Sequence, residues 1–377
     1  MMDRRKRALC AAIPFVLAFA VIIWVAVRLD RKYGDFVAFY NGAWVVRTGQ
    51  AAHLYDLDFT VEQERRNAPA LAAVIPSNRP AFYYVAIAPL SLLPYDAAWS
   101  CWLAVQALSL GACWFWGFRR FGNRGVLMSF LYPPVVLGIA HGQDAIFMLA
   151  IALASYSLAV SKRSFASGMV LGLALIKPHL VAVWPLALIV QRRWRMLAGF
   201  AVTGTVALAA FVATTGPQGL LSWMTLLRNR SIEAQNPPVY RQINAEAFSS
   251  AAGLGTVGAY LLSVLLVVGV LVVLRKAELW RLFALAITSS VFIAPHAMVY
   301  DYAAALLPLW LAAHESASHW TRYAALGLAT PILFTLIGMR PPLTIVPTLA
   351  VTGFIIVLCW GPWGAGSASA PLSGTSA

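Results

Sequence analysis

The stretch that decides the fold follows directly on the first hydrophobic segment and reads Tyr33-Gly34-Asp35-Phe36-Val37-Ala38-Phe39-Tyr40-Asn41-Gly42-Ala43-Trp44. At helical spacing its large apolar side chains form one stripe, made by Phe36, Phe39, Tyr40, Ala43 and Trp44. An aromatic-rich amphipathic helix beside a membrane span is expected to lie in the interface plane. This places Asp35 at the N-terminus of an interfacial helix, close to the bilayer surface.

Two interpretations of Asp35 follow from this position. A carboxylate at the bilayer surface is placed to act on a lipid headgroup. Asp is also a preferred N-cap residue and interacts favourably with the positive end of the helix dipole. The two roles can coexist, so the sequence leaves both open.

Composition identifies a polytopic membrane protein. Of 377 residues, 60% are hydrophobic and 11% are charged, and the mean hydropathy is +0.73; soluble proteins have about 25% charged residues. The net charge of +14 suggests nucleic acid only in a soluble protein. Here the basic residues cluster in short turns between apolar runs, which indicates membrane topology and leaves no role for nucleic acid.

The four cysteines and the N-terminus give further limits. Cys10, Cys101, Cys113 and Cys359 all lie in apolar runs without metal-ligand spacing, so we expect neither a disulfide nor a structural zinc. The basic run 4–7 precedes an apolar run over 8–27 that continues past any signal-peptide cleavage site, which favours a retained anchor.

The positive-inside rule gives a topology. Residues 4–7 place the N-terminus in the cytoplasm, so loop 29–80, with its balanced charges, is extracytoplasmic. Residues 82–93 are too few to cross a bilayer and predict a re-entrant or interfacial piece. The second span is expected at 97–118, a third runs outward and ends at 141–144, and a fourth returns to the cytoplasmic side at 162–163. Later spans are expected over 196–215, 253–274, 279–294, 302–313, 321–338 and 344–360, with a second outer loop over 216–250.

Residues 165–190 predict a broken helix. Basic residues at 162–163 and 192–195 put both ends on the cytoplasmic side, which a single span cannot do. Lys177-Pro178-His179 lies in the middle, and proline disfavours helix at the residue before it. Broken helices at membrane depth are tolerated where they line a cavity, so we expect Lys177 and His179 to face a polar pocket.

These features predict an all-α polytopic fold with about 12 passes, broken or re-entrant helices and both termini in the cytoplasm. Residues 1–363 form a single transmembrane catalytic domain, and 364–377 form a Gly/Ser/Ala-rich tail expected to be disordered. Ionisable groups inside or beside a membrane are functional hypotheses by default. Those assigned to the outer side are Asp35, Asp144, Lys177, His179, Arg228, Arg241, His296 and Asp301.

The order and spacing of several short motifs resemble glycosyltransferase family 87 over residues 30–305. They are Asp35-Phe36 with Phe39-Tyr40, Gly49, Tyr55-Asp56, Pro89-Leu90, Pro94-Tyr95, Gly142-Gln143, Gly172, Lys177-Pro178-His179, Arg192-Arg193-Trp194-Arg195, Pro295-His296 and Tyr300-Asp301. The resemblance implies a GT-C-type fold in the bacterial inner membrane with a periplasm-facing catalytic cavity. It implies an inverting transfer from a polyprenyl-phosphate sugar, mannose-like or another hexose or pentose, to a lipid or glycan acceptor, with Asp35 as general base.

Chemical reasoning about such a transfer agrees with this set. One carboxylate must take the proton of the acceptor hydroxyl, for which we choose Asp35. The leaving phosphate requires cations. We expect Lys177 first in this role and then Arg241 and Arg228. His179 and His296 are expected to donate hydrogen bonds to phosphate or sugar, and Asp301 to orient a sugar hydroxyl or to pair with Lys177.

Structural interpretations compete with each of these roles. Lys177 can pair with Asp144 or Asp301, because lone intramembrane charges usually find a partner. His296 and Asp301 can cap helix ends, and Arg228 can be solvated or contact ordinary headgroups. His314 and His319 receive no role.

The sequence Asp56-Leu57-Asp58 has the form of a metal-nucleotide motif. It lies on the predicted outer side, where nucleotide sugars are absent, so we discount it. Lys and Arg can neutralise a lipid-phosphate leaving group, so no metal is demanded and we expect no cofactor. The alternative function is a transporter or flippase of lipid-linked sugars, which also needs broken helices and membrane-depth charges. The chain shows no second copy of the Lys177-Pro178-His179 segment, and its large outer loops suit a one-sided cavity, so we favour the enzyme over the transporter. A third interpretation is a non-catalytic scaffold, which predicts that Asp35 can be replaced without consequence.

Overall fold

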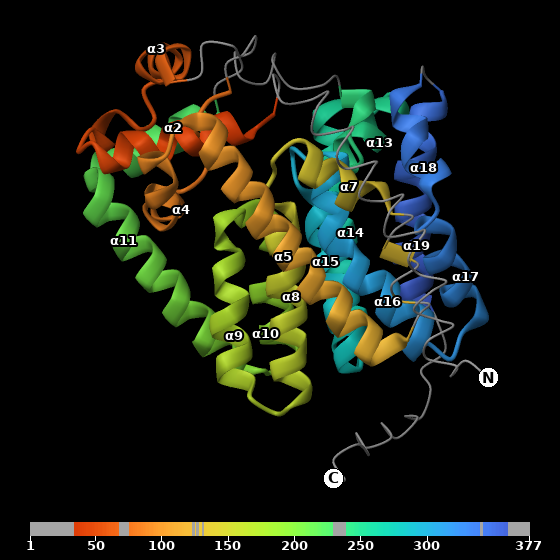
Figure 1. Cartoon of the computed structure of the whole chain (residues 1–377). Coiled ribbons are helices and arrows are strands. Elements are labelled where there is room, and N and C mark those ends of the chain that lie inside the picture. The colour runs from red at the N-terminus through yellow and green to blue at the C-terminus, as the bar shows by residue number, and fades with distance from the viewer. Residues whose placement is uncertain are drawn as a thin grey trace, which may run out of the picture.

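A computed structural model describes residues 34–67, 75–122, 132–228, 239–339 and 342–360, together with 125, 128 and 129. Every element in this part of the chain is a helix, with 3₁₀ helices labelled η (Figure 1). The first half comprises α2 (Phe36–Arg47), η1 (Ala51–His53), α3 (Leu57–Asn67), α4 (Ala81–Ile87), η2 (Ala88–Leu92), α5 (Tyr95–Phe121), α7 (Pro133–Ala140), α8 (Ala145–Val160), α9 (Ser164–Gly172), η3 (Leu173–Ile176), η4 (Pro178–Val181) and α10 (Trp184–Val190).

The second half begins with one very long helix. It comprises α11 (Trp194–Leu227), η5 (Val239–Arg241), α13 (Ala245–Ala251), α14 (Gly255–Leu274), α15 (Leu279–Ile293), η6 (Val299–Ala305), α16 (Leu306–Glu315), α17 (His319–Leu328), α18 (Pro331–Thr335), η7 (Leu336–Gly338), η8 (Leu343–Ile345) and α19 (Val346–Trp360). The predicted first span 8–27 and the tail 364–377 lie outside the described residues.

Four described helices are long and apolar enough to cross a membrane: α5, α11, α14 and the helix over Leu343–Trp360. A fifth span results if α17 and the helix over Pro331–Gly338, bent by 50° at their junction, are counted together. The predicted count of about 12 passes is therefore not confirmed, and the membrane character of the chain rests on these helices.

The long helices expose apolar side chains on a scale that lipid explains. Leu108 in α5 is 75% exposed, and Val257 and Leu265 in α14 are 71% and 70% exposed. Soluble monomers rarely expose contiguous apolar patches larger than a few hundred Å². The outer faces of these helices are therefore lipid-facing surfaces of a multi-pass membrane protein.

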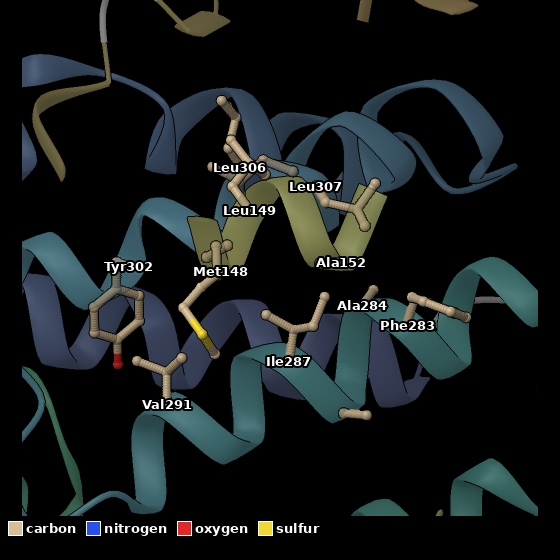
Figure 2. Close-up of a cluster of buried hydrophobic side chains, with 14 of the residues drawn as sticks. Met148, Leu149, Ala152, Phe283, Ala284, Ile287, Val291, Tyr302, Leu306 and Leu307 are labelled. Atoms are coloured by element: carbon tan, nitrogen blue, oxygen red, sulfur yellow. The ribbon is translucent and has the colours of Figure 1, made fainter. Parts of the chain in front are cut away.

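The centre of the molecule is formed by shorter helices, not by the long ones. In α15 every residue from Trp280 to Phe292 is buried, and α16 is buried from Leu306 to Ala312. Figure 2 shows Met148, Leu149 and Ala152 of α8 facing side chains of α15 and α16 across this core. This apolar core lies beside the elements that carry the polar site.

The break predicted within 165–190 is confirmed. The helix from Ser164 runs through η3 and ends at Lys177, whose backbone (φ −128°, ψ 76°) is not helical; a new helix starts at Pro178. Turns with positive φ at Lys162 and Arg192 flank the pair. Helix α9 packs against α8 and α11, and α10 packs against α11, α14 and α15 (Figure 1).

Close backbone contact holds the first half of the broken helix against α11. A Cβ atom on Gly168 or Gly199 would collide with the backbone of the facing helix, at Met196 and Phe165 respectively. A Cβ on Gly172 would collide with the side chain of Thr203. Small residues allow such approach between membrane helices. We call Gly168, Gly172 and Gly199 the glycine seam.

Helix α2 forms where the sequence predicts it, but the interfacial interpretation of its surface needs correction. Nine of its twelve residues are buried, including Asn41 and Gly42 on the expected polar face. The helix packs against α3, α4, η2 and α5 at one end of the molecule (Figure 1). Its aromatic stripe therefore contacts protein, because the outer segments cover the face that was expected to meet lipid.

Two further boundaries differ from expectation. The predicted outer loop 216–250 contains helix: α11 bends at Gly216 (φ 71°), before Pro217, and continues to Leu227, and α13 follows later. The expected span 321–338 is divided into α17, α18 and η7. Residues 82–93 do form the expected short piece, α4 with η2.

Candidate functional site

Charged and polar side chains from five separate segments meet beside the N-terminus of α2. Asp35 precedes α2, Arg79 precedes α4, Gln143 and Asp144 lie between α7 and α8, Lys177 lies at the helix break, and Asp301 belongs to η6. We call these six residues the polar cluster. Five of them are buried, and Asp35 is partly exposed.

Asp35 occupies the N-cap position of α2, yet its side chain makes no capping hydrogen bond. The carboxylate oxygen Oδ2 instead accepts a hydrogen bond from Nε2 of Gln143. The backbone N–H of Asp35 donates to the carbonyl of His141 at 2.8 Å, which ties the start of α2 to the end of α7. The prediction that this carboxylate caps the helix is therefore wrong, and the carboxylate faces the polar cluster.

The surroundings of Asp35 make it a stronger base than an exposed aspartate. Burial disfavours the charged form and raises the pKa of Asp35 above its ordinary value of 3.8. The hydrogen bond from Gln143 and the charges of His141, Arg79 and Lys177 oppose this rise without cancelling it. A raised carboxyl pKa brings proton affinity closer to that required of a general base near neutral pH.

Lys177 is held by acidic partners. It is 1% exposed, and its Nζ lies 2.7 Å from Oδ1 of Asp301, 2.9 Å from Oδ1 of Asp144 and 3.2 Å from Oε1 of Gln143. A lysine ammonium has three N–H donors, so each of them has an acceptor. The structural interpretation of Lys177 as a paired charge is confirmed, with two carboxylates in place of one.

Arg79 is the cluster residue that the sequence interpretation missed. Its Nε donates to Oδ2 of Asp144 at 2.8 Å and its Nη2 to Oδ1 of the same carboxylate at 3.1 Å, a bidentate ion pair. Nη2 also donates to Oε1 of Gln143 at 3.1 Å. The only sequence signal is its position directly before Pro80 and the short apolar helix α4, and the balanced charge of the outer loop concealed it.

A tight turn places Gln143 between these groups. Gly142 has φ 67°, and a Cβ atom there would collide with Trp99 and Phe36. The indole Nε1 of Trp102 donates to the carbonyl of Gly142 at 2.8 Å. Glycine is therefore required at this position both for its backbone angle and for space, and the turn that it makes aims Gln143 at Asp35.

Asp301 links the cluster to η6. Its Oδ2 accepts a hydrogen bond from the backbone N–H of Met298 at 3.0 Å, while Oδ1 accepts from Lys177. The pairing of Asp301 with Lys177 is thus confirmed. Asp301 is not the N-cap residue that the sequence suggested: Met298 holds that position, and Asp301 accepts its backbone N–H from the third residue of η6.

The polar cluster borders a cavity of about 140 Å³. Four of the predicted site residues line it: Lys177, His179, His296 and Asp301. Its other lining residues are Asn78, Arg79, Ile176, Pro178, Trp223, Leu226, Leu227, Met298 and Tyr300. The broken helix therefore does line a polar cavity, as the sequence predicted, and the bent end of α11 closes one side.

Two predicted cations lie outside this lining. Arg228 is exposed and directly follows Leu227, the last α11 residue of the cavity wall. Arg241 is exposed in η5. Neither is among the described residues that line the cavity, so the structure does not bring Arg228 or Arg241 together with the other predicted site residues.

The loop with His296 is fixed by its neighbours. Nδ2 of Asn244 donates to the carbonyls of Ala294 at 3.1 Å and Pro295 at 3.2 Å, and the N–H of Ile243 donates to the carbonyl of Ala297 at 3.2 Å. His296 is partly buried at the cavity wall. These contacts fix the backbone on both sides of His296, which lines the same cavity as His179 and Lys177.

Chemically, the site combines a partly exposed carboxylate with a cavity bordered by two cations and two histidines. Within the described residues no three His, Cys, Asp or Glu side chains are grouped as metal ligands. Cationic side chains, polar histidines and a neighbouring base are suited to binding an anionic group and activating a hydroxyl beside it.

Comparison with known proteins identifies the family. Searches of curated proteins and of solved structures find no significant match. The family model of glycosyltransferase family 87 matches residues 80–295, more than half of the chain, and this region includes Gln143, Asp144, Lys177 and His179. The chain therefore belongs to glycosyltransferase family 87.

Proposed function

We propose that the protein is an inverting glycosyltransferase that takes a sugar from a polyprenyl-phosphate donor and transfers it to a lipid or glycan acceptor at the periplasmic face of the inner membrane. The observation that carries this proposal is the position of Asp35. Its carboxylate makes no helix cap, has a raised pKa and lies in a polar cluster that borders the cavity.

In this proposal Asp35 is the general base. The acceptor hydroxyl donates its proton to the carboxylate as its oxygen attacks the anomeric carbon of the sugar, and the bond from that carbon to the phosphate oxygen breaks. The attacking oxygen and the leaving phosphate lie on opposite faces of the sugar, which inverts the configuration. The proton passes to Asp35 and the electron pair leaves with the polyprenyl phosphate.

The cavity is proposed to hold the donor phosphate and sugar. Arg79 has five N–H donors, of which four have acceptors among the described residues, so its guanidinium has one donor for a phosphate oxygen. Lys177 must exchange one acceptor to bind phosphate, and the neutral oxygen of Gln143, at 3.2 Å, is the most distant. His179 and His296 are proposed to hydrogen-bond phosphate or sugar, and Asp301 to hold Lys177 in place.

Arg228 and Arg241 are proposed to approach the donor only when it is bound. Both are exposed, and Arg228 continues directly from the wall of the cavity. Long cationic side chains at the mouth of a site favour the anionic substrate through charge complementarity. No metal or other cofactor enters this proposal: Arg79 and Lys177, which are ion-paired with Asp144 and Asp301, are proposed to donate hydrogen bonds to the leaving phosphate, and Arg228 and Arg241 to add positive charge.

The test is sugar transfer by the purified protein in nanodiscs, offered a panel of polyprenyl-phosphate sugars and a membrane lipid extract. Asp35→Asn keeps the shape of the side chain and removes the base, so we expect it to lose roughly 10²-fold or more in rate while still binding donor. Asp58→Asn is the matched control, since Asp58 is an exposed aspartate on the neighbouring α3.

Two results would overturn the proposal. Equal transfer by wild type and Asp35→Asn would show that Asp35 is not the base. Absence of transfer by the wild type, together with movement of the lipid-linked sugar across the bilayer in proteoliposomes, would identify a transporter.

A further inference from the structure

Gln143 joins the candidate base to both buried cations. Its side-chain Nε2 donates to Oδ2 of Asp35, and its Oε1 accepts from Nη2 of Arg79 at 3.1 Å and from Nζ of Lys177 at 3.2 Å. The residue is 5% exposed, and its backbone N–H is fixed by a 2.8 Å hydrogen bond to the carbonyl of Gly138. Every polar atom of this side chain is therefore directed at a charged group.

The charges around Gln143 determine which way its amide points. An amide has an acceptor end and a donor end, and Arg79 and Lys177 have only donors to offer. The amide oxygen must therefore face the two cations, which turns the NH₂ group toward Asp35. The reversed amide would place donor against donor on one side and oxygen against carboxylate on the other.

We propose that Gln143 is a positioning residue for the sugar transfer, because the cations that border the donor cavity orient its amide and the amide in turn orients the carboxylate of Asp35. This inference rests on the proposed function of Asp35 as general base. It extends that function by tying the geometry of the base to the groups that face the leaving phosphate.

The hydrogen bond also sets the pH range in which Asp35 is ionised. The charged and titratable groups that face this carboxylate are His141 at the end of α7, Arg79, Lys177 and Tyr300 of η6. Donation from Gln143 favours the charged carboxylate and lowers the pKa of Asp35. Loss of this donor must raise the pKa further, so the pH at which the base becomes active moves upward.

The experiment compares the pH dependence of transfer for wild type, Gln143→Met and Gln143→Glu. Methionine has similar length and lacks the N–H donor. We expect an acid limb shifted upward by roughly one pH unit, the size expected for one hydrogen bond to a charged group, and about tenfold lower kcat/KM on that limb. The loss should shrink as pH rises, since Asp35 then ionises in the variant as well.

Gln143→Glu keeps an acceptor for Arg79 and Lys177 and replaces the N–H donor with a second carboxylate. We expect this variant to shift the acid limb upward by at least as much as methionine does, because like charges raise the pKa of Asp35. It also provides the test if Gln143→Met does not fold. Gln50→Met is the matched control, as Gln50 lies beyond the far end of α2 and, within the part of the chain that the structure describes, its amide donates to Thr48 at 3.2 Å.

The outcomes separate this inference from the proposed function. If wild type transfers sugar and both Gln143 variants lose rate equally at every pH, or lose nothing, the positioning role is overturned while Asp35 remains the base. If wild type transfers no sugar at any pH, the proposed function fails and the inference fails with it.

Discussion

Helix α9 and its extension η3 are held in two different ways at two places. Along α9, the glycine seam brings backbone against backbone of α11, with no charged group involved. At the end of η3, Lys177 is held by two carboxylates and an amide from elements far away in the sequence. The glycine seam therefore sets the distance between α9 and α11, and the polar cluster fixes the side chain of Lys177 at the helix break.

Substitutions in the polar cluster and in the glycine seam should therefore lower the free energy of unfolding by different amounts. A buried ion pair that loses one partner leaves a charge uncompensated, which is among the most expensive changes in a protein interior. A filled glycine contact costs less, since helices can separate by a small distance. The comparison therefore predicts an order of effects, from the cluster to the seam to glycines outside both.

The largest effect is expected for Lys177→Met. Asp144 and Asp301 would lose a shared cation, and we expect a loss of about 3–5 kcal/mol in the free energy of unfolding. The measurement is unfolding in detergent followed by tryptophan fluorescence. Lys276→Met, at an exposed turn, is the control and should be neutral. Equal stability of the two variants would show that the cluster does not stabilise the fold.

An intermediate effect is expected for Gly199→Val. The new side chain would meet the backbone of α9 at Phe165 and force α9 and α11 apart, at about 2 kcal/mol. The same unfolding measurement applies. Gly269→Val is the control, since Gly269 lies within α14 with open space around it. A loss no greater than that of the control would mean that the seam tolerates a wider separation.

The smallest effect is expected for Gly216→Ala. No atom lies within 4 Å of a Cβ built at this position, so only the backbone angle of 71° opposes the substitution. This costs about 1 kcal/mol for a residue other than glycine. Gly353→Ala, in α19 with equally open surroundings, is the control and should be neutral or slightly stabilising. A loss as large as that of Gly199→Val would remove the distinction between contact and backbone conformation.

The sequence predicts the local features of this molecule well. The break at Lys177-Pro178 follows from proline chemistry, and the bounds of α5, α14 and α15 follow from runs of apolar residues. The convergence of Lys177, His179, His296 and Asp301 on one cavity agrees with the topology inferred from the sequence, which assigns all four to the same side of the membrane. Asp35, which that topology assigns to the same side, lies beside that cavity.

Other features depend on contacts that no local pattern encodes. The apolar stripe of α2 has the same period whether it meets lipid or protein, so its burial against α4 and α5 could not be read from spacing. The bidentate pair of Arg79 with Asp144 joins residues 65 positions apart. In the sequence Gln143 stands out only as part of the Gly142-Gln143 motif, and its role depends on the partners of both ends of its amide.

The length of α11 up to its bend can be compared with the thickness of a bilayer. From Trp194 to the bend at Gly216 the helix is about 33 Å long at 1.5 Å per residue, close to the thickness of about 30 Å of a hydrocarbon core. The segment from Trp194 to Gly216 is therefore long enough to span a bilayer, and the segment beyond the bend carries Trp223, Leu226 and Leu227 to the cavity wall. In the proposed function, a lipid-linked donor whose tail stays in the bilayer would reach the cavity along this bent segment.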